Sequence, residues 1–268
     1  MVAFPPGKIN LGLQVLSRRR DGYHDLSTCF YPVPATDVLE IIPANQFRFE
    51  QSGVLIPGPH SDNLCVKAYQ LLQTAHDLPP VHIHLHKVIP TGAGLGGGSS
   101  DASYTLRLLN SMFSLDLPLA ELMQYAARLG SDCAFFCQDN AMMGHGRGEV
   151  LSPLQISLKG YFLLLIKPAV HVSTAEAYAG ITPQIPAVDL ATVLQAPVAE
   201  WRTKLQNDFE LSVFARFPGI AAIKNSLYDA GAVYASMSGS GAAVFGLFDR
   251  EVSLNGEFTN AWIWSGWL

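Results

Sequence analysis

The stretch from Pro90 to Ser103, PTGAGLGGGSSDAS, constrains the fold of this chain more than any other feature. Glycine occupies positions 92, 94, 96, 97 and 98, and an amphipathic helical pattern begins where the stretch ends. Glycine lets a backbone approach another group closely, and the N–H groups at a helix start attract anions. Ser99 and Ser100 add two hydroxyl donors there. The segment therefore predicts a phosphate-binding loop; the competing interpretation is a flexible surface loop.

Two known phosphate-binding patterns match this loop only in part. Gly92, Gly94 and Gly97 satisfy the GxGxxG fingerprint of dinucleotide-binding folds. That fingerprint follows a strand buried on both faces, whereas the strand predicted here alternates with histidines and stops at Pro90. A Walker loop requires a Lys followed by Ser or Thr after its last glycine, and these glycines precede no such Lys. The context disfavours the dinucleotide interpretation.

The composition indicates a compact globular protein. Of its 268 residues, 49% are hydrophobic and 15% are charged. The net charge of −5 offers no broad basic face, so we expect no nucleic-acid partner. The apolar runs are far shorter than the roughly 20 residues of a membrane span, and the N-terminus lacks a secretory pattern, so we expect a cytoplasmic protein with no membrane partner. The four cysteines lack CxxC spacing, which favours reduced, buried thiols.

Periodicity along the chain predicts an α+β protein. Strand patterns, cap residues and helical spacing alternate without a regular βαβ repeat. Helices are expected over 61–76, 100–113, 117–130, 207–217 and 218–231, and strands over 8–16, 37–43, 47–53, 81–90 and 160–168, with a hairpin over 233–249.

The expected strand over 81–90 has two different faces. Val81, Ile83, Leu85 and Val88 are predicted to face the core. The histidines at 82, 84 and 86 then share the other face. They are either a solvated sheet surface or an HxHxH metal face.

Three further stretches accompany the glycine-rich loop: PPGKINLGLQVLSRRRDGYHDL from Pro5, LGSDCAFF over 129–136 and MSGSGAAVF over 237–245. In this combination and order the sequence resembles the GHMP kinases, from Lys8 to about Phe248. One departure is Gly7, where the family usually has Ala; it leaves Lys8 in place.

The resemblance implies a fold, a boundary and cofactors. The expected fold is a two-lobed GHMP kinase, with an N-terminal lobe like domain 2 of ribosomal protein S5 and a ferredoxin-like C-terminal lobe that closes over the substrate. We place the lobes at 1–155 and 156–268, and we expect the chain to pass from one lobe to the other within about 150–165. The implied reaction transfers the terminal phosphoryl of ATP, with Mg²⁺, to an alcohol. No carboxylate stands out as a metal ligand.

Two charged residues are candidates for catalysis. Asp132 follows a predicted helix end at Gly130 and precedes the apolar CAFF, so its carboxylate is expected at the edge of a dry pocket, where it could accept the hydroxyl proton. Lys8 could keep Asp132 ionised and polarise the hydroxyl. The resemblance assigns these positions the same jobs. The alternatives are a turn or capping residue for Asp132 and a solvated surface amine for Lys8.

Substrate contacts are expected from four further residues. Asn10 shares a strand face with Lys8 by period two and could bind the reacting hydroxyl. In DGYHDL a turn presents Tyr23 to stack on a base and His24 to read its edge. The resemblance implies that this base is the cytosine of a cytidine diphosphate group, and that Tyr178 is the second aromatic of a sandwich. Ordinary packing is the alternative for Tyr178.

The remaining expectations concern the nucleotide and the chain end. Asn63 matches a position that touches adenine in the family, and a helix cap is equally natural. The SGSG turn at 238–241 either is a plain hairpin turn, closes on phosphates or supports the glycine-rich loop. The Trp-rich end, NGEFTNAWIWSGWL, either packs on the core or forms a subunit contact, and the oligomeric state stays open. The predicted nucleotide-binding residues are Asn63, Pro90, Thr91, Gly92, Ala93, Gly94, Leu95, Gly96, Gly97, Gly98, Ser99 and Ser100.

Overall fold

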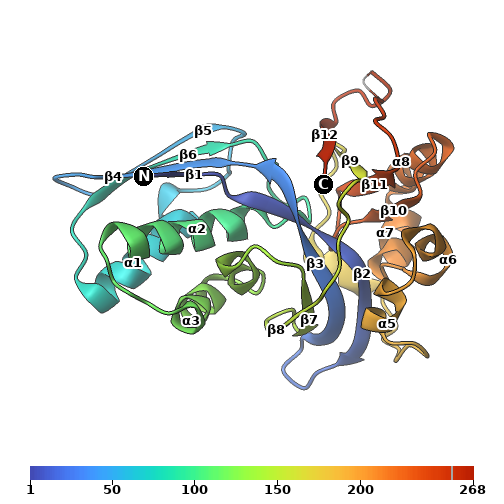
Figure 1. The fold of residues 1–268 in the computed structure, drawn as a ribbon, viewed down its shortest axis with the longest axis horizontal. Helices are drawn as coiled ribbons and strands as arrows, with labels where there is room; N and C mark the ends of the chain where they lie inside the picture. The colour runs from blue at the N-terminus through green and yellow to red at the C-terminus, as the bar shows by residue number, and fades with distance from the viewer. Residues whose placement is uncertain (255) are drawn as a thin grey trace. The chain divides into compact units, whose positions relative to one another are not determined.

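A computed structural model describes residues 1–254 and 256–268. The chain divides into two compact units, shown as a ribbon in Figure 1. Unit 1 comprises residues 1–7, 35–91 and 96–139, and unit 2 comprises 8–34, 92–95 and 140–268. Residues 8–34 therefore group with the C-terminal half of the chain in this division. The lobes placed at 1–155 and 156–268 from the sequence stay a prediction.

Unit 1 combines one mixed sheet with helices. Its strands lie in the order β1-β4-β6-β5; β4 pairs antiparallel with β1 and β6, and β5 pairs parallel with β6. Figure 1 shows α1 and α2 on one side of this sheet. The elements are β1 (Val2–Ala3), β4 (Val38–Pro43), β5 (Arg48–Gly53), η1 (His60–Asp62), α1 (Leu64–His76), β6 (Val81–Lys87), α2 (Gly97–Met112), α3 (Leu119–Leu129) and η2 (Cys133–Cys137).

Strand β6 corrects one detail of the sequence analysis. Val81, Ile83 and Leu85 are fully buried, as predicted, but the fourth inward position is Lys87. Val88, which we had predicted to face the core, lies beyond the end of the strand and is half-buried. The physical reason is the period of two, which continues through Lys87 regardless of its charge. A lysine therefore occupies a core position.

Unit 2 contains two antiparallel sheets and several helices. Strand order is β2-β3-β7-β8 in one sheet and β10-β11-β9-β12 in the other. Its elements are β2 (Pro6–Arg18) and β3 (His24–Thr36), both nearly whole, and β7 (Met142–Gly146), β8 (Val150–Pro153), β9 (Phe162–Lys167), α4 (Thr174–Ala179), α5 (Leu190–Leu194), η3 (Val198–Glu200), α6 (Trp201–Lys204), α7 (Phe209–Arg216), α8 (Pro218–Asp229), β10 (Tyr234–Met237), β11 (Val244–Phe248) and β12 (Trp262–Trp267).

The Trp-rich end of the chain packs on unit 2. Strand β12 pairs antiparallel with β9, with Trp264 opposite Leu165, and the ring of Trp267 meets that of Phe162 at 5.3 Å between centroids. Ile263 packs against the buried cluster that includes Val244. Of the two alternatives for this tail, packing on the core is the one observed.

The mixed helix-and-sheet class predicted from periodicity is confirmed. The predicted helices at 207–217 and 218–231 appear as α7 and α8, and the 233–249 hairpin appears as β10 and β11. Among the described residues, no helix combines the length and apolar character that crossing a bilayer requires.

Candidate active site

The start of helix α2 carries the features expected of an anion-binding site. Its N-cap, Gly96, has φ +69°, and no side chain caps the helix. The amides at 97–99 precede the first intrahelical bond, from Ser100 N to Gly96 O, and point from the positive end of the helix dipole. Ser100 is fully buried, yet its Oγ has no hydrogen-bond partner among the described residues. An unused buried hydroxyl beside uncapped amides fits a phosphate ligand.

Residues 92–95 of the glycine-rich segment are held tightly within unit 2. Gly94 has φ +78°, and a Cβ added there would lie 2.0 Å from Ser238 O. Gly94 O accepts hydrogen bonds from Ser238 Oγ at 2.8 Å and from Lys8 Nζ at 2.9 Å. Ala243 N donates to Ala93 O at 3.0 Å. The 238–241 turn therefore supports this part of the segment, and the flexible-loop interpretation is wrong here.

Substituting alanine at this position tests how closely the two backbones approach. In Gly94→Ala the alanine has an unfavourable left-handed φ, and its Cβ also clashes with a backbone oxygen, Ser238 O, that is held in place by the fold. The φ alone costs about 1 kcal/mol of unfolding free energy, and we expect the variant to lose clearly more than that. Gly160→Ala is the matched control, because Gly160 has φ +92° but open space around it. Urea unfolding of both variants measures the difference. Equal losses would show that the close approach does not matter.

Lys8 is a buried ammonium at the start of a polar chain in unit 2. The residue is 3% exposed, and Nζ donates to Asn10 Oδ1 at 2.6 Å. Asn10 Nδ2 donates to Thr28 Oγ1 at 2.9 Å, which in turn donates to Gly12 O at 2.6 Å. Lys8 and Asn10 thus share one strand face, as period two predicted. The surface-amine alternative for Lys8 is wrong.

Asp132 lies in unit 1 between a helix end and an apolar turn. Gly130 ends α3 as its C-cap, and Asp132 precedes η2, of which every residue is buried. As a residue, Asp132 is half-buried, and its side chain makes no capping hydrogen bond to η2. Asp132 lies in the turn between α3 and η2 without a side-chain cap hydrogen bond, so the turn alternative fits its position and the capping alternative does not; the catalytic role stays a prediction.

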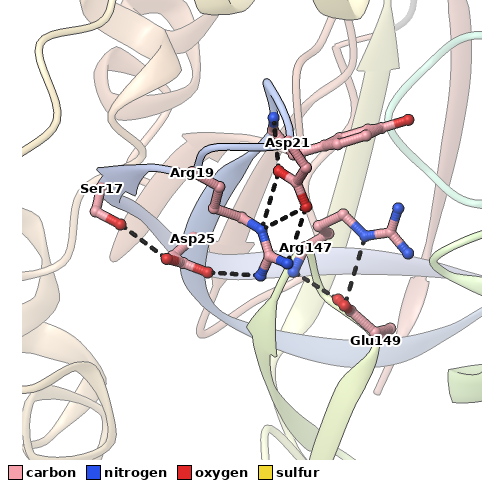
Figure 2. A network of polar contacts seen from close by, with 7 residues as sticks. Ser17, Arg19, Asp21, Asp25, Arg147 and Glu149 are labelled. Carbon is pink, nitrogen blue, oxygen red and sulfur yellow. Dashed lines mark hydrogen bonds and ion pairs between the residues drawn. The ribbon is translucent and has the colours of Figure 1, made fainter.

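The loop that carries Tyr23 and leads into His24 at the start of β3 is braced by an ion-pair network, shown in Figure 2. Arg19 pairs with Asp21 and Asp25, each at 3.0 Å, and Ser17 Oγ donates to Asp25 Oδ2 at 2.8 Å. The hydrogen bond from Ser17 and the pair with Arg19 hold the pKa of Asp25 below its ordinary value. Asp21 also accepts from Tyr23 N at 3.1 Å. The network fixes the backbone that presents Tyr23.

The three aromatic candidates do not make the same contacts. His24 stacks on Tyr178, with 4.6 Å between ring centroids and 17° between planes. Tyr178 also meets Phe209 edge-on at 4.7 Å. Tyr23 is 54% exposed, and the guanidinium of Arg147 lies 4.9 Å from the centroid of its ring. The structure therefore brings His24 and Tyr178 together, and a base can enter between these two only if their stack opens.

Asn63 is the N-cap of α1. Its Oδ1 accepts from Cys65 N at 2.9 Å, so the cap alternative is confirmed. The adenine contact stays a prediction, since the cap uses one oxygen and leaves the amide group to other partners.

The histidine face of β6 is partly solvated. Ser52 Oγ lies 2.9 Å from both His84 Nε2 and His86 Nδ1, and His82 Nε2 lies 3.4 Å from Glu50 Oε2. Among the described residues, no group of three or more His, Cys, Asp or Glu side chains is arranged to hold a metal ion. These contacts favour a polar sheet surface.

A cavity of about 460 Å³ in unit 2 involves none of the predicted site residues. Gln14, Thr192 and Asp208 are among those that line it. Asp208 Oδ2 accepts from Val15 N at 2.7 Å and thereby ties β2 to the segment before α7. We assign the carboxylate this structural role, because the chemistry expected of a kinase lies with the glycine-rich segment.

Sequence reasoning missed a buried charged cluster in unit 1. Lys87 Nζ pairs with Asp37 and, at 2.8 Å, with Asp101 Oδ2. Period two along β6 could have flagged Lys87, because it continues the row of Ile83 and Leu85. Nothing local to Asp37 or Asp101 marks them as its partners.

Comparison with known proteins agrees with this geometry. The model of the GHMP kinases N terminal domain matches residues 63–140, and that of the GHMP kinases C terminal domain matches 192–255. The chain belongs to the GHMP kinase family. As a GHMP kinase it is a phosphotransferase that uses ATP as its donor and acts on a small alcohol.

Relatives within the family are similar over almost their whole length. The chain is 50% identical to a 4-diphosphocytidyl-2-C-methyl-D-erythritol kinase of Cytophaga hutchinsonii, covering 94% of this chain and 93% of the relative. It is 46% identical to the kinase of that name from Parabacteroides distasonis, covering all of both chains. A crystal structure of a 4-(cytidine 5'-diphospho)-2C-methyl-D-erythritol kinase matches with a TM-score of 0.80 at 33% identity, over 92% of this chain and 90% of that one.

More distant structures share the fold alone. A putative homoserine kinase from Listeria monocytogenes matches with a TM-score of 0.68 at 20% identity, over 98% of this chain and 94% of that one. The two-lobed GHMP fold expected from the sequence is confirmed by these matches.

Proposed function

We propose that this kinase phosphorylates the 2-hydroxyl of 4-diphosphocytidyl-2-C-methyl-D-erythritol, in the non-mevalonate route to isoprenoid precursors. The observation that carries the proposal is the 46–50% identity, over nearly whole chains, to kinases that bear this substrate's name. Within unit 2, the braced loop at Tyr23 and the stacked pair of His24 and Tyr178 supply aromatic surfaces suited to a base. The proposed setting is the cytoplasm.

The donor is proposed to bind at the glycine-rich segment. The amides at the start of α2 and the hydroxyl of Ser100, which has no partner in the part of the chain that the structure describes, fit the phosphates of ATP. We propose that Mg²⁺ accompanies the nucleotide and neutralises phosphate charge. The chain's contribution is then to hold and orient the donor, with Asn63 as the proposed adenine contact.

The acceptor chemistry is assigned to Asp132, Lys8 and Asn10. Asp132, half-exposed beside an apolar turn, is the proposed acceptor of the hydroxyl proton. Lys8, a buried cation held by Asn10 and by Gly94 O, is proposed to stabilise negative charge that develops during transfer. Asn10 is proposed to bind the reacting hydroxyl as well as orienting Lys8.

The direct test supplies purified protein with Mg-ATP and one alcohol at a time. We expect ADP with 4-diphosphocytidyl-2-C-methyl-D-erythritol, and phosphorus NMR of the product should show a phosphate on its 2-oxygen. Homoserine and mevalonate are the comparison alcohols. If ADP formed only with homoserine or mevalonate, the proposed substrate would be wrong. If the protein bound nucleotide but formed no ADP with any alcohol, it would be a catalytically silent nucleotide-binding protein.

Base recognition gives a second measurable effect. Tyr23→Ala is expected to raise the KM for the cytidyl substrate by about 5- to 150-fold, because a stacked base contributes about 1–3 kcal/mol. The KM for ATP should change little. Tyr23→Phe is the matched control, since it keeps the ring and should keep the KM. If Tyr23→Ala raised both KM values equally, Tyr23 would not belong to the cytidine site.

A further inference from the structure

The buried cluster of Asp37, Lys87 and Asp101 lies entirely within unit 1. The exposed fractions of these side chains are 0% for Asp37, 0% for Lys87 and 2% for Asp101. Lys87 ends β6, Asp37 immediately precedes β4, and Asp101 lies in the second turn of α2. Three elements that are distant in sequence therefore meet at one ammonium.

The cluster holds residues on both sides of the glycine-rich segment. Asp37 Oδ1 accepts from Val88 N at 2.6 Å and from Ile89 N at 2.8 Å, so it fixes the residues that lead into the segment. Lys87 packs against the other side, because a Cβ on Gly97 would lie 2.9 Å from Nζ. Lys87 and Asp101 then join this anchor to α2. The helix start proposed to receive phosphate thus rests directly on these buried charges.

The charges do not balance without an added proton. Two carboxylates and one ammonium sum to −1, and an uncompensated charge in a dry interior is strongly unfavourable. Asp37 uses both carboxylate oxygens to accept hydrogen bonds from three donors, the two amides and Lys87, so an added proton there would have to displace one of them. Asp101 accepts from Lys87 alone, and its buried Oδ1 has no partner among the described residues. The proton therefore belongs on Asp101.

The neighbouring titratable groups agree with this assignment. Burial raises the pKa of Asp101 to about 7, with Lys87 opposing the rise and Asp37 adding to it. From α1, the thiol of Cys65 faces the cluster, and burial raises its pKa as well, so it stays neutral. For Lys87, burial lowers the pKa, but the two carboxylates outweigh this and raise it. Lys87 remains charged throughout.

We propose that Asp101 is a positioning residue that carries a proton when the phosphoryl donor binds, which keeps the buried cluster under the start of α2 electrically neutral. This rests on the proposed binding of ATP phosphates at that helix start. An ionised Asp101 would leave a net negative charge beneath the site and oppose the phosphates. When Asp101 is ionised before binding, its carboxylate takes up one proton from solvent as the phosphoryl donor binds. No other bond forms or breaks.

Thermodynamic linkage gives the sign of the effect. If donor binding favours the protonated form, deprotonation must weaken donor binding by the same factor. Donor affinity should therefore fall as pH rises past the point where Asp101 loses its proton. Asparagine at 101 mimics the neutral carboxyl and cannot ionise, so the Asp101→Asn variant should not show this fall.

The experiment measures Kd for a nonhydrolysable Mg-ATP analogue from pH 6 to pH 9. The proteins are the wild type, Asp101→Asn and Asp77→Asn, a control at an exposed carboxylate of the same unit. The protonation of the ligand also changes with pH, but it affects all three proteins equally, so it cancels when their Kd values are compared at the same pH. We expect the Kd of the wild type and of the control to rise by about tenfold more than that of Asp101→Asn. The same pH dependence in all three proteins, or weaker binding by Asp101→Asn throughout, would overturn the proposal.

Stability provides a readout that needs no ligand. The pKa of Asp101 in the folded protein lies above its ordinary value of 3.8, so the stabilisation is complete below about pH 4 and is lost as pH rises to about 7. The wild type should therefore lose stability relative to Asp101→Asn between pH 4 and pH 8 in urea unfolding. If the difference in unfolding free energy between the wild type and Asp101→Asn stayed the same from pH 4 to pH 8, Asp101 would not carry a proton in the folded protein. If the wild type failed to bind nucleotide at any pH, the proposed function would fail, and this comparison would still decide the protonation state.

Discussion

Asp132→Asn is expected to lower kcat by about 10²- to 10⁴-fold, the contribution typical of a positioned general base. The amide keeps the shape of the carboxylate but cannot take a proton at neutral pH. KM values for ATP and for the alcohol should change less than about threefold, since the interaction removed acts on the transition state rather than on binding. Steady-state kinetics with both substrates varied measures this split.

The control for this prediction is Asp249→Asn, the same change at an exposed carboxylate just after β11. We expect it to leave kcat and both KM values unchanged. Thermal unfolding of both variants verifies that each is folded, so that a loss of turnover can be attributed to the missing carboxylate. Full turnover by Asp132→Asn would remove Asp132 from the proposed chemistry.

Lys87→Met should lower the free energy of unfolding by about 3–5 kcal/mol, because it removes the ammonium from a fully buried ion cluster and leaves two carboxylates. For a chain of this size the corresponding fall in Tm is about 6–20 °C. The loss should be larger at pH 8 than at pH 5, since a proton on Asp101 relieves part of the repulsion. Urea unfolding at both pH values measures the effect.

Lys67→Met is the matched control for that substitution. Lys67 lies 3.8 Å from Asp62, and the side chains are 45% and 68% exposed. Exposed pairs of this kind contribute about 0–1 kcal/mol, so the control should unfold almost as the wild type does. Adding Asp101→Asn to Lys87→Met should recover part of the lost stability, because it removes one of the two facing charges. No recovery would mean that the loss comes from packing rather than from charge.

Local patterns predicted much of this protein. The period of two placed Lys8 and Asn10 on one face of β2, and the hydrogen bond between their side chains confirms it. Helical spacing and cap residues located α1, with Asn63 as its cap, as well as α7 and α8. These features depend on neighbours within a few residues, so the covalent geometry of the chain carries them.

Other features depend on contacts that no local pattern contains. The face-to-face contact of His24 and Tyr178 joins residues more than 150 positions apart. The family resemblance implied that both lie near the base, but it predicted no stack of Tyr178 on His24. The close approach of Gly94 to Ser238 likewise joins two turns that are far apart in the chain, and it decides between the three interpretations of the SGSG turn that the sequence left open. Such pairs depend on how the sheets and helices pack, which the spacing of residues along one segment does not specify.

The sequence by itself determined the helices and strands whose residues repeat every two to four positions, such as α7, α8 and the alternating part of β2, and its composition marked the glycine-rich segment. Local patterns did not predict β3, β7, β8 or β12. Only the tertiary structure decided the charge state beneath the start of α2. Lys87 was readable as an inward position of β6, but its partners Asp37 and Asp101 reach it from other elements. Whether a buried charge is tolerated depends on what surrounds it in space, and those surroundings exist only once the chain has folded.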